Sequence, residues 1–409
     1  MHSMCSCPCG CEVDFLPQTA ALAPLTDPRL VAPHVSRLRL THFRSHAGVD
    51  INVDCGAVIL TGPNGAGKTN ILEAISMLAP GRGLRSAQLD DMAATHVDSG
   101  WTVLADITTA TAPMRVGVGF EHGGTGRELR VDGAPARGFE KISMALPQLW
   151  LTPAMDRLFT DSASGRRRFI DRFAQKLLPG LSTQLNQYER AMRERNKLLQ
   201  TPGTQISSNG WLDGLEENMA SLGTAIAAAR LAALDTLAEG LAAMPETVFP
   251  RAEVALEGML EAGLRAQPAI EVEDNWRARL HGDRARDRTA GRSLEGPHRT
   301  DLHVTHAAKN MAAAKCSTGE QKGLLVGLIM AQARSVAART GDVPILLLDE
   351  VAAHLDAARR QALFEILRDL GGQSWITGTD ASAFADFTHA TSHLHISAGA
   401  VLPGPGIQL

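Results

Sequence analysis

GPNGAGKT, residues 62–69, decides how the rest of the chain is interpreted. The segment fits the pattern G-x-x-x-x-G-K-[ST], follows the strand-like run AVILT and precedes the helix-like run NILEAISML. Its glycines let the backbone curl so that successive amides and a helix N-terminus face bound phosphates. We therefore predict a nucleotide-binding loop formed by Gly62, Pro63, Asn64, Gly65, Ala66, Gly67, Lys68 and Thr69.

The last two residues of this loop point to ATP and Mg²⁺ as cofactors. Lys68 supplies a positive charge for the β and γ phosphates, and Thr69 offers its hydroxyl to Mg²⁺. The complementary half is ILLLDEVAAHLD at 345–356, where an apolar strand presents Asp349 at its carboxyl end to hold the same metal. Glu350 is then placed to orient or deprotonate the attacking water. Two acids at a helix start are also ordinary capping residues, and the pairing with the 62–69 loop favours the catalytic interpretation.

A third segment, CSTGEQKGLL at 316–325, has two interpretations. On its own it is an N-capped helix, because a Ser or Thr followed by Glu320 makes a capping box. In the order loop, long insertion, CSTGEQ and Asp-Glu strand, it resembles the signature segment of an ABC ATPase head. That resemblance implies that two protomers sandwich two ATP molecules and that the signature acts on the partner's nucleotide through Ser317, Thr318, Gly319 and Glu320.

Several further strings resemble the RecF family of SMC-like ABC ATPases. They are LTHFRSH near the start, SGRRRFIDRF at 164–173, YERAMRERNKLL at 188–199, GPHRTDL at 296–302 and the pair STGEQK and LLLDEVAAHLD. The resemblance spans about residues 36–398. It implies a weak ATPase that works as a switch: an ATP-dependent homodimer closes on double-stranded DNA at gap junctions, reopens on hydrolysis, and helps RecR and RecO to load recombinase in repair, replication restart and the SOS response.

The resemblance has departures and rivals. TPAMDRLF at 152–159 lacks the acids expected after its proline, Gln148 is the counterpart of the glutamine loop, and Thr379 or Asp380 stands where a switch histidine is expected. Another SMC-like repair ATPase would need long heptad arms or a paired-Cys hook. A transporter ATPase subunit would need a membrane partner and would ignore DNA, and a scaffold with a vestigial site would not need intact Lys68 and Glu350.

The fold class predicted is α/β, an ABC/SMC-type ATPase head with an inserted, largely helical second lobe. Short β-like runs surround the loop, and from Arg166 to about Met244 the apolar residues recur at helical spacing. TPGTQISSNG at 201–210 is predicted to be the tip of a helical hairpin. The resulting division is 1–34 as a disordered extension, 35–160 as the first part of the head, 161–295 as the helical lobe and 296–409 as the second part of the head.

Clusters of arginine are the candidate DNA contacts, because such clusters can follow phosphates. The candidates are Arg166, Arg167 and Arg168 on one predicted helix and Arg190, Arg193 and Arg195 on the next. They alternate with acids, which is also the pattern of a solvated helix face with internal ion pairs. No base-reading motif is present, so recognition of shape and backbone is expected.

Composition sets the outer limits. With 409 residues, 44% hydrophobic, 21% charged and a formal charge of −4, the chain has no global attraction to nucleic acid. No apolar run reaches the roughly 18 residues of a membrane span, so a cytoplasmic protein without a membrane partner is expected. Four of six cysteines lie at Cys5, Cys7, Cys9 and Cys11. This tip is either a metal ligand set or, more simply, part of a disordered or mis-started extension.

Overall fold

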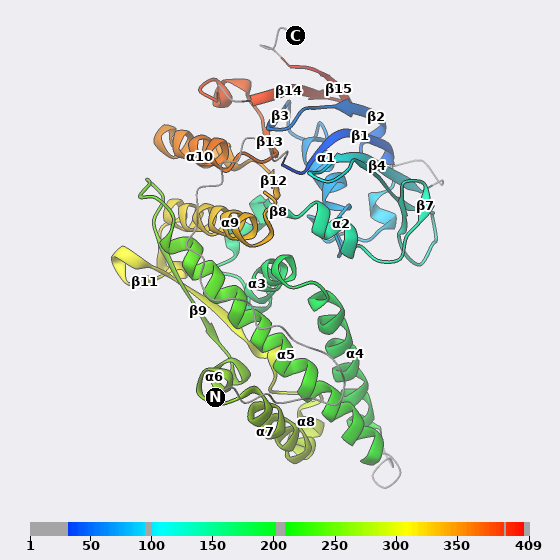
Figure 1. Cartoon of the computed structure of the whole chain (residues 1–409), viewed down its shortest axis with the longest axis vertical. Coiled ribbons are helices and arrows are strands. Elements are labelled where there is room, and N and C mark those ends of the chain that lie inside the picture. Colours follow the sequence, from blue (N-terminus) through cyan, green and yellow to red (C-terminus); the bar gives the residue numbers. More distant parts are fainter. Residues whose placement is uncertain (1–31, 95–99, 202–208, 388–389, 405–409) are drawn as a thin grey trace.

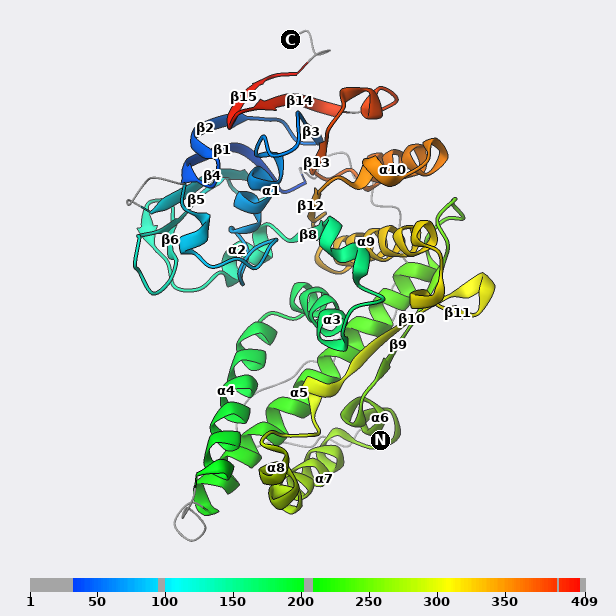
Figure 2. The same ribbon diagram turned by 180° about the vertical axis from the view of Figure 1, so that it is seen from behind.

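The computed structural model describes residues 32–94, 100–201, 209–387 and 390–404. A head built on two sheets carries a helical lobe on one side, as Figures 1 and 2 show. This arrangement confirms the predicted class of an α/β head with a largely helical lobe. The Cys-rich tip and the hairpin tip at 202–208 lie outside the described residues.

The first sheet of the head has the order β15-β14-β3-β13-β12-β8. Its strands are β3 (Ala57–Thr61), β8 (Gln148–Leu151), β12 (Ile345–Leu348), β13 (Ser374–Gly378), β14 (Ala390–Ser397) and β15 (Ala400–Pro403). The pairs from β8 to β14 are parallel, and β15 joins antiparallel to β14. The apolar strand predicted before Asp349 is confirmed as β12. Because the carboxyl ends of the parallel strands share one edge, motifs far apart in sequence meet there.

The second sheet of the head is antiparallel, with the order β2-β1-β4-β5-β6-β7. Its strands are β1 (His34–Phe43), β2 (His46–Asn52), β4 (Trp101–Thr108), β5 (Met114–Phe120), β6 (Glu128–Val131) and β7 (Ala134–Pro135). Burial alternates along β4 as expected for a strand with one covered face. Strands β2 and β3 are separated by a turn at Gly56, whose φ is 125°.

Alternate residues of the parallel sheet enter two different cores. Leu347 of β12 packs with α1 (Lys68–Ser76) and the antiparallel sheet, whereas Leu346 and Leu348 pack with α9 (Thr318–Thr340) and α10 (Ala357–Leu370). Side chains alternate across a strand, so these two sets mark opposite faces. Helices α1 and α9 therefore cover opposite faces of one sheet.

The lobe contains the helices that the sequence periodicity predicted and some elements that it did not. Its helices are α3 (Ala163–Leu177), α4 (Leu181–Gln200), α5 (Asn209–Ala242), α6 (Met259–Ala266), α7 (Ala269–Gly282) and α8 (Arg284–Ala290), while α2 (Glu140–Ala145) lies in the head. Strands β9 (Ala252–Glu257), β10 (Asp301–His306) and β11 (Met311–Ala312) form a small sheet. Strand β9 pairs with β10, so this sheet includes strands from both sides of residue 295, where the sequence analysis placed the end of the helical lobe.

Helix α5 is the longest element and connects the lobe to the head. It packs beside α4 and α7 in the lobe and beside α9 in the head, as both views show. By length and composition, Gly210–Ala242 is the one described helix that could cross a membrane. A mostly buried core helix passes the same test, and 61% of its most apolar window is buried.

Candidate functional site

The loop at 62–67 connects the buried strand β3 directly to α1. Gly62, Gly65 and Gly67 have positive φ values of 142°, 79° and 110°, which L side chains rarely adopt. A Cβ on Gly62 would lie 2.1 Å from the Ile396 carbonyl oxygen, so glycine is required there by space as well. The loop follows the course predicted from the sequence.

The N-terminus of α1 is suited to an anion. Gly67 occupies the N-cap and no side chain caps the helix, so its first amides keep their donor capacity. Lys68 is buried and donates from Nζ to the carbonyl oxygens of Gly62 at 2.7 Å and Pro63 at 2.9 Å. Burial lowers the pKa of Lys68, and the charges of Glu350 and Asp349 oppose that shift. The N-terminus of α1 and the Lys68 ammonium together thus form a positively charged site of the kind that binds phosphates.

One carboxylate oxygen of Asp349 accepts hydrogen bonds from two hydroxyl groups. Thr69 Oγ1 and Thr377 Oγ1 each donate to Asp349 Oδ1 at 2.8 Å. The Asp349 amide donates to the Leu151 carbonyl oxygen at 2.8 Å, which fixes the end of β12 against β8. A carboxylate beside a threonine hydroxyl, next to a phosphate cradle, is the set of oxygens that Mg²⁺ takes with a nucleotide. Within the described ranges no cluster of three or more His, Cys, Asp or Glu could hold a metal, and this mode of binding needs none.

Glu350 follows β12 in an unusual backbone conformation. Its φ is 51°, in the left-handed region, and its amide donates to Thr377 Oγ1 at 2.8 Å. A non-glycine residue held there costs about 1–3 kcal/mol and is found mainly at functional sites. Thr377 therefore fixes both acids of the Asp-Glu pair, through its hydroxyl proton to one and its lone pair to the other.

Sequence reasoning missed Thr377 and His46. Thr377 is fully buried at the carboxyl end of β13, two residues before the predicted Thr379, which is exposed, as is Asp380. His46 is also fully buried, with Nδ1 2.7 Å from the Gly399 carbonyl oxygen and Nε2 3.1 Å from that of Gly67. A small polar residue ending a strand beside the Asp-Glu strand was the available signal for Thr377. His46 lies in the quoted string LTHFRSH, but nothing in its spacing gives these partners.

The CSTGEQ segment begins α9 with a complete capping box. Ser317 Oγ accepts from the Glu320 amide, and Glu320 Oε2 accepts from the Ser317 amide at 3.0 Å. Lys309 pairs with Glu320 and, together with Ser317, holds the pKa of this carboxyl at about 2. Ser317 and Thr318 are exposed and Gly319 is half-exposed. Because α9 and α1 cover opposite faces of the sheet, the structure does not bring this segment to the chain's own loop.

Gln148, the expected glutamine-loop residue, lies away from the nucleotide site. It is the first residue of β8 and pairs with Ile345, whereas Leu151 at the other end of β8 pairs with Leu348 beside Asp349. The expected role for Gln148 is therefore wrong, because the parallel register places it at the amino ends of the strands.

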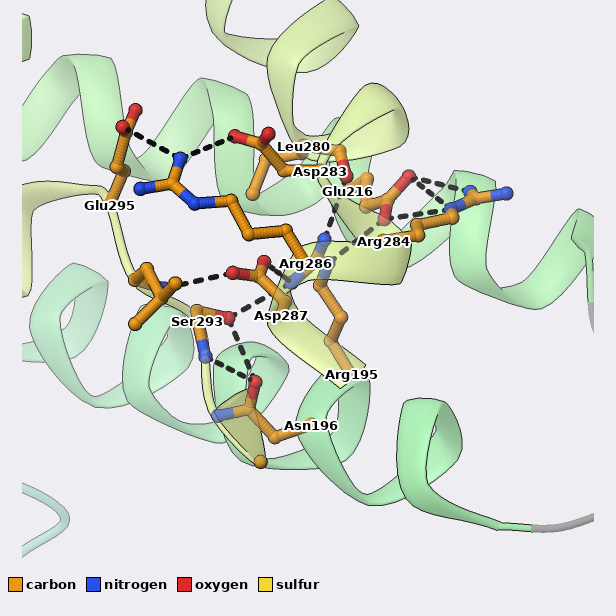
Figure 3. Close-up of polar contacts among 12 residues, drawn as sticks. Arg195, Asn196, Glu216, Leu280, Asp283, Arg284, Arg286, Asp287, Ser293 and Glu295 are labelled. Carbon is orange, nitrogen blue, oxygen red and sulfur yellow. Dashed lines mark hydrogen bonds and ion pairs between the residues drawn. The ribbon is translucent and has the colours of Figure 1, made fainter. Parts of the chain in front are cut away.

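One of the predicted DNA contacts is excluded by burial. Arg195 has no exposed surface and pairs with Glu216 at 2.8 Å and Asp287 at 2.6 Å. It also donates to Ser293 Oγ and the Leu280 carbonyl oxygen, as Figure 3 shows. This guanidinium joins α4, α5, α7 and α8 inside the lobe, and its charge is neutralised there. The prediction that Arg195 contacts DNA is wrong for this conformation.

The remaining five arginines differ in how far they are committed to protein contacts. Arg166 is bidentate to Asp301 at 2.7 and 2.8 Å, and Arg167 donates to the Thr300 carbonyl oxygen at 2.8 Å. Both lie at the junction of α3 with β10. The other three are exposed: Arg168, Arg190 and Arg193. Arg190 forms an ion pair with Glu194 at the surface.

The comparisons with known proteins agree with this architecture. The RecF/RecN/SMC N terminal domain family matches residues 34–395. Two proteins named DNA replication and repair protein RecF, from Mesorhizobium japonicum and Agrobacterium fabrum, are 47% and 46% identical over 373 and 378 residues, covering 90% of this chain and 98% of each relative.

Two solved structures share the fold. A recombination mediator protein RecF-ATPrS of the RecFOR pathway superposes with a TM-score of 0.80 at 21% identity, over 91% of this chain and 99% of that one. An Smc head domain from Pyrococcus furiosus gives a TM-score of 0.52 at 15% identity, over 90% and 95%.

Proposed function

The chain belongs to the RecF family of SMC-like ATPases, and on that basis we propose that it is an ATP-dependent recombination mediator that binds DNA in replication and repair. In this proposal ATP drives dimerisation on double-stranded DNA, and hydrolysis releases it. The protein then helps to load recombinase at single-strand gaps. RecO and RecR are the proposed partners, since the solved RecF structures are described as part of the RecFOR pathway. The proposed compartment is the cytoplasm.

The observation that carries this proposal is the placement of two half-sites on opposite faces of one sheet. The loop, Lys68, Thr69 and Asp349 lie with α1, whereas Ser317 and Thr318 lie exposed at the start of α9. One chain cannot close its own signature segment over its own loop without crossing the sheet. Two chains related by a two-fold axis can complete both sites at once, in a symmetric, closed interface.

Each site residue has a proposed role that follows from its contacts. Lys68 and the amides of 62–67 hold the phosphates, and Thr69 and Asp349 hold Mg²⁺, which neutralises charge on the transferred phosphoryl group when bound. Glu350 orients the attacking water, and Thr377 positions both acids. Thr318 and Gly319 present the amides that the capping box leaves free to the partner's γ phosphate, and Ser317 offers its hydroxyl there.

Complementation of two inactive variants tests this arrangement. Lys68→Ala removes the phosphate ligand, and Thr318→Glu places a carboxylate at the α9 N-terminus, where it suits the helix and repels phosphate. Each variant alone should lose ATPase activity. A mixture should regain part of it, because the intact loop of one protomer meets the intact signature of the other. A mixture that stays inactive while both proteins are folded would contradict the trans arrangement.

The DNA role needs its own measurement. We expect light scattering to show an ATP-dependent dimer for wild type and a longer-lived dimer for Glu350→Gln, whose neutral amide still hydrogen bonds but cannot take a proton. Fluorescence anisotropy should show that this dimer retains duplex DNA with an affinity that falls as salt rises. An ATP-dependent dimer that ignores DNA at all salt concentrations would leave the ATPase intact and reject the mediator role.

A further inference from the structure

A cavity of about 370 Å³ lies at the junction of the head and the lobe, away from the loop at 62–69. Its walls come from the start of β8, from α3 and α4, from the segment after α1 and from Gln332 of α9. Gln148, Leu149 and Trp150 of β8 line it, and the first of them, Gln148, lies at the amino ends of the parallel strands. Asp349 marks the opposite, carboxyl ends, so the cavity is separate from the ATP site.

Positive charge is concentrated in this cavity without matching carboxylates. Arg82, Arg168, Arg172 and Lys176 line it, against two acids, Asp171 and Glu189. Asp171 is already bidentate to Arg230, at 2.7 and 3.0 Å. No ion pair is formed by Arg172 or Lys176 within the part of the chain that the structure describes. The cationic side chains thus face the cavity with little compensation.

Arg172 and Lys176 are half-buried, which is unfavourable for their charges. Burial, followed by the neighbouring charge of Arg172, lowers the pKa of Lys176 to about 8. Burial, followed by the charge of Arg168, lowers the pKa of Arg172 to about 10. The Arg172 guanidinium lies 5.5 Å from the centroid of the Trp150 ring, a cation–π contact that stabilises its charge. Neighbouring cations in a cleft, with pKa values lowered by burial and by each other's charge, are typical of a site that binds an anion.

Unpartnered amides complete the wall. Gln148 is 1% exposed, and neither its Nε2 nor its Oε1 has a hydrogen-bond partner; Gln332 is 2% exposed, and its Nε2 has none. Buried polar atoms are almost always paired in native proteins, and each unpaired one costs about 1–3 kcal/mol. These three atoms can pair with a ligand that carries both donors and acceptors.

We propose that this cavity is a second nucleotide-binding site, in which Arg168, Arg172 and Lys176 hold a phosphate and Gln148 and Gln332 hydrogen bond the rest of the nucleotide. The volume exceeds what a phosphate alone fills and lies in the range of small-ligand pockets, roughly 300–1,000 Å³. The nucleotide comes either free in solution or as one unit of a DNA strand. The existence of a nucleotide pocket does not depend on the proposed mediator role. Only the possibility that the nucleotide is part of a DNA strand rests on that role.

The test uses the whole chain with Mg²⁺ and one equivalent of a non-hydrolysable ATP analogue per chain, so that the loop at 62–69 is filled and no free analogue competes for the pocket. Thymidine monophosphate, inorganic phosphate, a short oligothymidine and a short duplex are the probes. Binding is followed by calorimetry and by protection of Lys176 from acylation near pH 8, quantified by mass spectrometry. The variants are Lys176→Gln and Arg172→Gln, with Lys141→Gln, an exposed lysine of α2, as the matched control.

We expect a nucleotide probe to protect Lys176, and each pocket variant to weaken its binding about tenfold or more, as loss of a charge-assisted hydrogen bond does. Lys141→Gln should bind like wild type, and all proteins should bind the ATP analogue equally. Protection by thymidine monophosphate identifies a free nucleotide, and protection by DNA alone identifies a strand.

Two results would overturn the pocket. One is DNA binding by wild type with no probe protecting Lys176, which leaves the mediator role standing. The other is protection by inorganic phosphate alone, which excludes a nucleotide. Protection by thymidine monophosphate in a protein that binds no DNA would support the pocket and reject the mediator role.

Discussion

Thr69 and Asp349, 280 positions apart in the chain, are joined by a hydrogen bond of 2.8 Å from the threonine hydroxyl to Oδ1 of the carboxylate. The bond exists because parallel strands β3 and β12 end at one edge of the sheet, separated only by β13. The two proposed Mg²⁺ ligands are therefore brought together by the chain itself. Preformed ligands need little reorganisation when the metal arrives with ATP.

Thr69→Ala should weaken Mg²⁺-dependent ATP binding by about tenfold, since one oxygen ligand and one partner of Asp349 are lost. Titration with a fluorescent ATP analogue, with and without Mg²⁺, measures the effect. The matched control is Thr289→Ala, whose exposed hydroxyl bonds only within α8, to the Ala285 carbonyl oxygen. Equal Mg²⁺ dependence in Thr69→Ala and wild type would reject the metal assignment.

Thr377→Val should reduce turnover much more than ATP binding. Valine fills the same volume but neither donates to Asp349 nor accepts from the Glu350 amide. Turnover should fall about tenfold or more, with a loss of about 1–3 kcal/mol in the free energy of unfolding. Steady-state kinetics and urea denaturation measure both.

Thr236→Val is the control for Thr377→Val, because Thr236 is also buried and hydrogen bonded but lies in α5, away from the site. It should lose similar stability and keep its turnover. If both variants lose turnover equally, the effect of Thr377 is one of folding and the positioning role fails.

Arg195→Met should destabilise the lobe by about 3–5 kcal/mol, because Asp287 remains buried without its cation and Glu216 keeps only its pair with Arg284. Arg193→Met, two residues away and exposed, should change stability by no more than about 0.5 kcal/mol. Thermal denaturation measures the difference. A mild effect of Arg195→Met, combined with lost DNA affinity, would restore the original DNA-contact prediction for Arg195.

Lys176→Met should stabilise the free protein at pH 7. The pKa of Lys176 is lowered in the fold to about 8 from 10.5, so the fold disfavours the charged form of this side chain. The resulting loss in the free energy of unfolding is complete below pH 8, decreases between pH 8 and 10.5, and is absent above pH 10.5. The stability gained by Lys176→Met should be about 3 kcal/mol at pH 7 and vanish as pH rises through that window. Urea denaturation at several pH values measures it. A gain that does not depend on pH would show that Lys176 is not buried in its charged form.

Much of the site could be predicted because its motifs act locally. The glycines at 62–67 and the apolar run before Asp349 determine a loop and a strand end whatever surrounds them. The periodic residues Tyr188, Met192 and Leu199 likewise predicted α4. The same spacing places Arg195 on the buried face of α4. Its charge nevertheless made it a candidate for DNA contact in the sequence analysis.

Other features depend on contacts that no local pattern contains. The partners of Arg195 lie 21 and 92 residues away, and Thr377 is defined by its neighbour strand. Strand β9, AEVALE, has one β-branched residue and was missed, because its pairing with β10 determines its conformation. The register that moved Gln148 away from Asp349 is likewise a property of the assembled sheet.

Helix α5 has a mechanical consequence. Its 34 residues make a rod of about 51 Å, packed against α9 at one end and against α4 at the other. A tilt of about 5° about its head end carries the far tip roughly 4 Å, by the 1.5 Å rise per residue. In the proposed dimer, a small displacement of α9 would thus be magnified along this helix into a shift as large as a nucleotide step at the outer end of the lobe.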